Sequence, residues 1–276
     1  MGSISTYLIR LSIVFVCALV TSCTTVKTTN SGTIGINRVQ RMSPLISEKD
    51  LQAGATLAYQ QIITEERSKG TLNSDEVMSR RVRAIADKII PAVTVFRPDA
   101  LEWDWQVNVI ESDQLNAWAM PGGKIAFYSG IINRLQLTDG EIAAIMGHEI
   151  AHALREHSRE RASEQATSGL AIGIGGALLG AGGELTDMAS LAYNSTFGLK
   201  HSRSHETEAD RIGVELAARS GFDPRAAISV WQKMAKVTGG GSGGPEWLST
   251  HPSNETRIAD LTVYSEKVIG LYQASR

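Results

Sequence analysis

Cysteine is scarce in this chain, which contains only Cys17 and Cys23 among its 276 residues. Cys17 lies in a segment that we expect to be removed, and Cys23 lies where we expect acylation. Neither a disulfide within one mature chain nor a cysteine-based zinc site is therefore expected. A metal ion would have to be held by histidine and carboxylate side chains.

Positive charge is not in excess, since 27 Lys and Arg residues stand against 29 Asp and Glu residues. Such a chain has no general attraction for a phosphate backbone, so nucleic acid is not an expected partner. Hydrophobic residues make up 42% of the chain and charged residues 20%, which is ordinary for a globular protein. No internal repeat is evident. We expect one catalytic domain.

The first 22 residues contain no acid, one arginine and an apolar run over 11–20. This is the layout of a signal peptide, and the run is too short for a membrane-spanning helix, which needs about 20 residues. The run is followed by Cys23 in the sequence VTSC, which resembles a bacterial lipobox. In such signals the cysteine becomes the first mature residue and carries a lipid. A plain secretory peptide that leaves Cys23 as a free thiol is the alternative.

The organisation that follows from this has three parts. Residues 1–22 are a signal peptide, residues 23–46 are a lipid-anchored flexible tether rich in Thr, Ser, Asn and Gly, and residues 47–276 are the folded domain. By analogy with bacterial lipoproteins, Thr24 favours a lipid-anchored protein of the outer membrane that faces the periplasm.

The domain reads as an α+β fold that is mostly helical. Apolar residues recur at helical spacing over 47–68 and 74–90, whereas residues 103–110 alternate apolar and polar side chains as a strand does. A second extended run, 124–128, follows a Pro-Gly-Gly turn. We expect a small antiparallel sheet.

Thr138 and Glu141 have the spacing of a capping box, and apolar residues follow at helical intervals to Leu154. We expect further helices over 204–220, from Asp223 to about 237, and from about 253 onwards, with a flexible loop at 239–244. The glycine-rich stretch 169–183 fits either a close-packed helical hairpin or a flap that contacts a membrane.

The sequence HEIAH at 148–152 lies inside the capped helix. Four residues advance a helix by little more than one turn, so His148 and His152 project from the same face and can reach one ion. A catalytic zinc ion has three protein ligands and an exchangeable water, and Glu149 is placed to take a proton from that water. The five residues supply two zinc ligands and a general base.

The third ligand is not part of this segment. The positions at which a metzincin has its Gly and third His are Arg155 and Ser158. A carboxylate from another helix remains, and Glu206 is one candidate among the acids of the chain. Asp210 would share its helix face and could hydrogen-bond a ligating histidine.

HEIAH, the segment SRSHETEADRIG at 202–213 and the segment NAWAMPGG at 116–123 together resemble peptidase family M48. That family includes prenyl-protein peptidases and peptidases of the bacterial envelope. The resemblance covers roughly 51–271 and implies that Glu206 is the third zinc ligand, with Asp210 behind it.

The resemblance also implies a place for an extended substrate along Asn116, Ala117, Trp118 and Ala119. These side chains fit equally well a buried strand that supports the active-site helix. His251 resembles a histidine that can approach the zinc in bacterial members, and an ordinary surface histidine is the alternative. Arg257 fits either substrate binding or a salt bridge. His157 and His205 lack the ligand spacing and are left out of the site.

The sequence therefore predicts a zinc-dependent endopeptidase that cleaves unfolded or misassembled envelope proteins, with Glu149 as the general base and His251 as a possible oxyanion donor. An assembly factor or chaperone with latent proteolysis is a second hypothesis. A purely structural metal site is a third, and it would need a fourth tight protein ligand.

Overall fold

The computed structural model describes residues 23–167, 184–238, 246–251 and 255–276. The expected signal peptide, the glycine-rich stretch 169–183 and the expected loop at 239–244 lie outside the described residues. No helix in the described part of the chain is long and apolar enough to cross a membrane.

The central sheet has three strands, β3 (Gln106–Ile110), β4 (Ala117–Met120) and β5 (Lys124–Tyr128), in the order β3-β5-β4. β4 and β5 are antiparallel, but β3 and β5 are parallel. The expectation of an antiparallel sheet is therefore wrong for one of the two pairs. The chain leaves β3, passes to the far edge as β4 and returns through a tight turn into the middle as β5, an order that residue alternation does not reveal.

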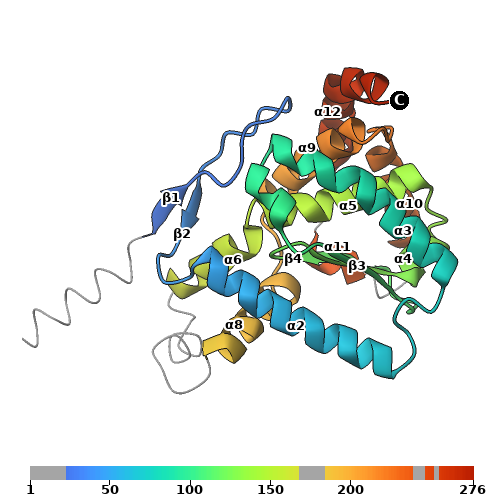
Figure 1. Cartoon of the computed structure of the whole chain (residues 1–276). Coiled ribbons are helices and arrows are strands. Elements are labelled where there is room, and N and C mark those ends of the chain that lie inside the picture. The colour runs from blue at the N-terminus through green and yellow to red at the C-terminus, as the bar shows by residue number, and fades with distance from the viewer. Residues whose placement is uncertain (1–22, 168–183, 239–245, 252–254) are drawn as a thin grey trace, which may run out of the picture.

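Helices cover both faces of this sheet (Figure 1). On one side lies α2 (Glu48–Ser68), and on the other lie α3 (Glu76–Ile89) and α5 (Asp139–Leu154). Alternate residues of β4 separate accordingly: Ala117 and Ala119 join the larger core with α5, whereas Trp118 and Met120 join a smaller core with α2. β4 thus lies directly against the helix that carries HEIAH.

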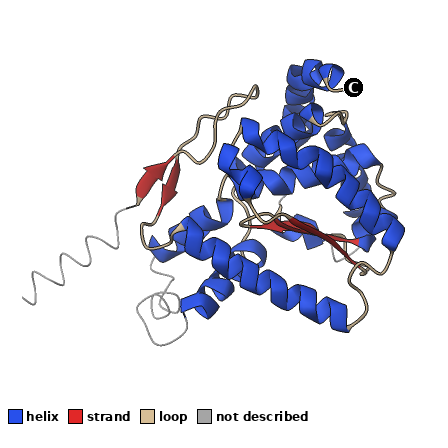
Figure 2. Cartoon of the chain, in the orientation of Figure 1, coloured by secondary structure: helices blue, strands red, loops and turns tan. Residues whose placement is uncertain are grey.

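The expected helices are present (Figure 2). Ser47 and Asp75 cap α2 and α3, and the capping box of Thr138 and Glu141 starts α5. The remaining elements are β1 (Thr24–Val26), β2 (Gln40–Met42), the 3-10 segments η1 (Ile90–Val95) and η2 (Pro98–Glu102), α4 (Ser129–Arg134), α6 (His157–Thr167), α8 (Glu184–Tyr193), the π-helical η3 (Asn194–Gly198), α9 (Arg203–Arg219), α10 (Ala226–Thr238), α11 (Glu246–Thr250) and α12 (Glu255–Ala274).

The segment before α2 is packed onto the domain, which contradicts the expectation of a flexible tether over 23–46. β1 and β2 pair as an antiparallel ribbon, and Ile34, Ile36 and Met42 are buried. Arg38 forms ion pairs with two buried glutamates, Glu160 and Glu208. The polar composition of this segment gave no sign of these contacts, because Arg38 binds partners more than 100 positions away in the sequence.

The helices α5 and α9 cross where two glycines face each other. A Cβ atom built on Gly213 would lie 2.8 Å from the backbone nitrogen of His148, and one built on Gly147 would lie 2.8 Å from the carbonyl oxygen of Gly213. Any side chain at either position would push the backbones apart. This close approach brings the acidic residues of α9 to the histidines of α5.

Candidate metal centre

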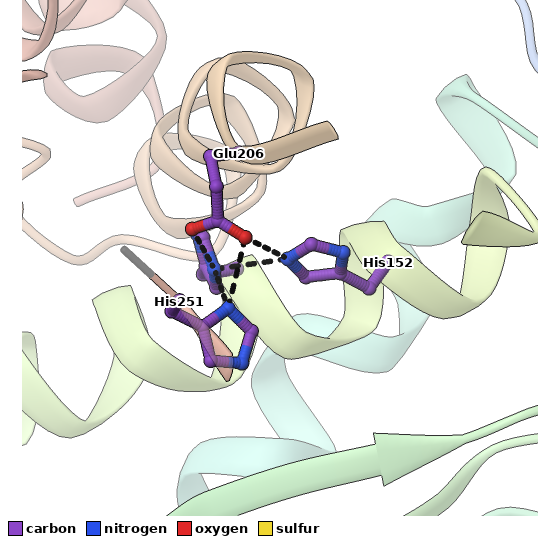
Figure 3. A group of neighbouring side chains, drawn as sticks. His152, Glu206 and His251 are labelled. Atoms are coloured by element: carbon purple, nitrogen blue, oxygen red, sulfur yellow. Dashed lines mark hydrogen bonds and ion pairs between the residues drawn. The ribbon is translucent and has the colours of Figure 1, made fainter. Parts of the chain in front are cut away.

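His148 and His152 lie on one face of α5 and are both buried. Their Nε2 atoms are 3.0 Å apart. α9 supplies Glu206, whose carboxylate oxygens lie 3.6 Å from Nε2 of His148 and 3.5 Å from Nε2 of His152. His251 completes the group, with its Nδ1 3.0 Å from Glu206 and 3.2 Å from Nε2 of His148 (Figure 3). Ligands about 2.0–2.1 Å from a tetrahedral zinc ion are about 3.3 Å from one another, so this group has the size of a zinc site.

Asp210 holds His148 from behind. The Nδ1 atom of His148 lies 3.0 Å from the Asp210 carboxylate, which also pairs with the buried Arg257. Burial alone would lower the pKa of His148, but the hydrogen bond to Asp210 and the charge of Glu206 raise it above its usual value. Donation from Nδ1 to Asp210 leaves Nε2 as the acceptor that faces the centre. Arg257 also pairs with Glu206, which favours the salt-bridge interpretation of this arginine.

His152 is also oriented through its Nδ1 atom, by a chain that runs through His157 to a carboxylate. Its Nδ1 lies 2.9 Å from Nδ1 of His157, and Nε2 of His157 lies 3.1 Å from the carboxylate of Glu208. If Glu208 accepts from His157, then His157 accepts from His152, and Nε2 of His152 is again an acceptor. Burial lowers the pKa of both imidazoles, as do neighbouring positive groups, so both are neutral at neutral pH.

The chemistry of this donor set fits a cation. Two imidazole nitrogens and a carboxylate face one another in a buried space, and the raised pKa of His148 shows that these surroundings favour positive charge there. Burial alone would raise the pKa of Glu206, but His251 and Arg257 lower it well below its usual range, so the carboxylate is ionised. A divalent ion at the centre would satisfy all three groups.

Glu149 lies beside the group and not within it. Its Oε1 atom accepts a hydrogen bond of 2.8 Å from the indole nitrogen of Trp247, and Nε2 of His251 lies 3.5 Å away. Trp247 and His251 belong to the short segment that starts as α11, and their rings stack with centroids 4.9 Å apart. One segment therefore contacts both Glu149 and the group formed by His148, His152 and Glu206.

The cavity beside the centre is lined by β4 and the segment before it, with Asn116, Ala117, Trp118 and Ala119 on one side and Glu149 and His152 on the other. Its volume is about 50 Å³, which is room for a few water molecules and not for a peptide. Trp118 points mainly into the core beside α2, where its ring meets those of Tyr59 and Phe197 edge on. The substrate assignment of these four residues remains a prediction.

Sequence reasoning missed several residues that surround the centre. His157 and His205 were left out because they lack ligand spacing, yet all six histidines of the chain form one buried cluster of contacting rings: His148, His152, His157, His201, His205 and His251. Such clustering in a chain so poor in histidine could have been suspected from their positions near the two motifs. Cys23, by contrast, is a half-buried free cysteine just before β1.

Comparison with known proteins agrees with this geometry. The model of peptidase family M48 matches residues 77–265. The mitochondrial metalloendopeptidase OMA1 of Bos taurus is 36% identical over 177 residues, which are 59% of this chain and 33% of that protein. The beta-barrel assembly-enhancing protease of Escherichia coli K12 is 28% identical over 222 residues, which are 75% of this chain and 44% of that protein. The chain thus spans less than half the length of either relative.

The family match covers more than half of the chain and includes both HEIAH on α5 and the acidic segment of α9. The resemblance drawn from these motifs is thereby confirmed. The protein is a member of peptidase family M48.

Proposed function

We propose that the protein is a zinc-dependent endopeptidase whose metal ligands are His148, His152 and Glu206. The observation that carries the proposal is the convergence of two Nε2 acceptors and an ionised carboxylate within 3.0–3.6 Å of one another. A zinc ion held there would lower the pKa of a water molecule towards neutrality and polarise a peptide carbonyl.

The chain's own groups supply the proton transfers and the orientation. Glu149 takes a proton from the attacking water and delivers it to the leaving amine. Asp210 and His157 fix the two imidazoles in the tautomer that turns Nε2 to the centre. Arg257, paired with Glu206 and Asp210, keeps both carboxylates ionised in a buried site.

The described arrangement is a closed one. His251 occupies the place of a fourth ligand, the indole of Trp247 binds Glu149, and the cavity is too small for a peptide. We propose that the segment bearing Trp247 and His251 moves away when substrate enters, which frees the base and opens one position at the metal. His251 then becomes available as an oxyanion donor.

The test is a cleavage assay on an unfolded protein such as reduced casein. Glu149→Gln should retain zinc and fold while losing cleavage, and a zinc-directed hydroxamate should inhibit the wild-type protein. Undiminished zinc-dependent cleavage by Glu149→Gln would refute the assignment. Retained zinc with no wild-type cleavage and no hydroxamate binding would favour a structural metal site.

We further propose that the protein acts on unfolded or misassembled proteins at a bacterial envelope, anchored to the outer membrane by a lipid on Cys23. The lipobox-like sequence and the name of the Escherichia coli relative support this. Mass spectrometry of the membrane fraction should detect acylated Cys23 at a new N-terminus, and Cys23→Ser should release the protein into the soluble fraction. Membrane retention of Cys23→Ser would contradict the anchor.

An assembly role without cleavage is the second candidate, favoured by the closed cavity and by the words "assembly-enhancing" in the relative's name. Complementation of an envelope defect separates the two. Equal rescue by wild type and Glu149→Gln favours binding, and rescue by wild type alone favours proteolysis.

A further inference from the structure

We propose that Arg161 is a specificity-determining residue that binds a carboxylate of the polypeptide substrate beside the metal centre. The inference rests on the peptidase function proposed above. It adds that the protein recognises a substrate carboxylate close to the cleaved peptide bond.

Arg161 lies on α6 and is 4% exposed. Its guanidinium contacts the ring of His201, the carbonyl oxygen of Ser195 and, at 3.4 Å, the hydroxyl of Ser158, while its Nε atom has no hydrogen-bond partner in the described part of the chain. An imidazole, a carbonyl and a hydroxyl carry no negative charge, so none of these groups is a counterion for the guanidinium.

The other buried arginines differ from Arg161 in this respect. Arg97, Arg155 and Arg257 each form an ion pair of 2.9 Å or less with a carboxylate. Within the ranges that the structure describes, Arg161 has no carboxylate within ion-pair distance. Burial of a cation without a counterion is unfavourable, and a bound carboxylate would supply the negative charge that Arg161 lacks.

The side chain of Arg161 borders the cavity beside the metal centre. Arg161 and His201 line the same cavity as Glu149, His152 and β4, and the ring of His201 lies 3.8 Å, centroid to centroid, from that of His152. Arg161 is thus one ring beyond a proposed metal ligand. An extended chain rises about 3.3 Å per residue, so the carboxylate would belong to a residue within about three positions of the cleaved bond.

The guanidinium is suited to this role at neutral pH. Burial lowers the pKa of Arg161 to about 9, while Glu164 on the same helix and the two glutamates near the centre, Glu206 and Glu149, oppose the shift, so the side chain stays protonated. Those two glutamates are occupied by Arg257 and Trp247 and do not reach Arg161. A planar guanidinium with free N–H groups binds carboxylates through two parallel hydrogen bonds.

The carboxylate could come from an Asp or Glu side chain or from the end of a chain, and two series of matched peptides separate these sources. One series exchanges Glu for Gln at each of three positions on either side of the cleaved bond. The other compares a free carboxyl terminus with its amide. We expect the wild-type protein to prefer the carboxylate at one position by about 10- to 100-fold in kcat/KM, mainly through KM.

Arg161→Gln should abolish the preference, so that the acidic peptide and its neutral counterpart are cleaved with equal kcat/KM. Arg159→Gln is the matched control, since Arg159 lies on the same helix but is bound to Glu156 and to the carbonyl of Ile46; this variant should keep the preference. Fluorescence anisotropy of the same peptides with zinc-loaded Glu149→Gln measures binding without cleavage and should show the same preference.

Equal binding and cleavage of acidic and neutral peptides by the wild-type protein would overturn the proposal, whether or not Arg161→Gln folds. A preference that survives in Arg161→Gln would also overturn it, because the metal itself would then be the attracting cation. If no peptide is cleaved but acidic peptides bind in an Arg161-dependent manner, the peptidase function fails and the carboxylate site stands.

Discussion

Replacing Gly213 with alanine should separate α5 from α9 and weaken both the fold and the metal site. The new Cβ atom would lie 2.8 Å from the backbone nitrogen of His148, whereas ordinary contacts begin near 3.4 Å. Because the opposing atoms are backbone, the helices must move apart by several tenths of an ångström. Overpacking of this kind costs about 1–3 kcal/mol, while alanine in a helix gains about 1 kcal/mol over glycine.

Gly270→Ala on α12 isolates the overpacking cost, since a Cβ atom at Gly270 meets nothing within 4 Å. We expect this control to gain stability, and we expect Gly213→Ala to be less stable than the control by about 1–3 kcal/mol in urea unfolding of the metal-free proteins. Glu206 lies two turns from Gly213, and zinc–ligand distances tolerate only about 0.2 Å. Zinc affinity should therefore fall in Gly213→Ala and not in Gly270→Ala. Equal stability and equal zinc affinity of the two variants would refute the close-packing argument.

Three further predictions concern the surroundings of the centre. Asp210→Asn removes the charge that orients His148, so zinc affinity should fall about 10- to 100-fold in a chelator competition assay; unchanged affinity would contradict this role. Trp247→Phe keeps the ring but removes the donor to Glu149, so peptide cleavage should rise several-fold, and an equal or lower rate would argue against the closed state. Burial alone would raise the pKa of Glu160, but its hydrogen bonds and ion pairs lower it far below 4.5. The ionised Glu160 thus stabilises the fold fully above the unfolded pKa of about 4.3, and this stabilisation is lost as the pH falls below that value. The free energy of unfolding of the metal-free wild-type protein should therefore depend more steeply on pH below about 4.3 than that of Glu160→Gln. Equal slopes for the two proteins would refute the effect.

The placement of HEIAH on a capped helix was predictable because every signal for it is local. The capping box and the helical spacing lie within residues 138–154. The residues alone left Glu206 as one of several candidate third ligands for His148 and His152. Its position beside them depends on the close crossing of α5 and α9 at Gly147 and Gly213. The family resemblance, and not the spacing, selected that acid.

The features that could not be predicted from the sequence depend on contacts between residues far apart in the chain. His157 binds Glu208 across 51 positions, and Arg38 reaches Glu160 across 122. The parallel pairing of β3 with β5 depends on the path of the chain between them. Periodicity reports which face of an element is apolar, and it carries no information on which polar side chains meet across two elements.

The most direct test of the central claim is anomalous diffraction at the zinc absorption edge from crystals grown with zinc. The account predicts one strong peak bounded by Nε2 of His148, Nε2 of His152 and the carboxylate of Glu206, at about 2.0–2.2 Å from each. A peak elsewhere, such as among His157, Glu160 and His205, which also lie close enough to share an ion, would contradict the account, and so would the lack of any peak.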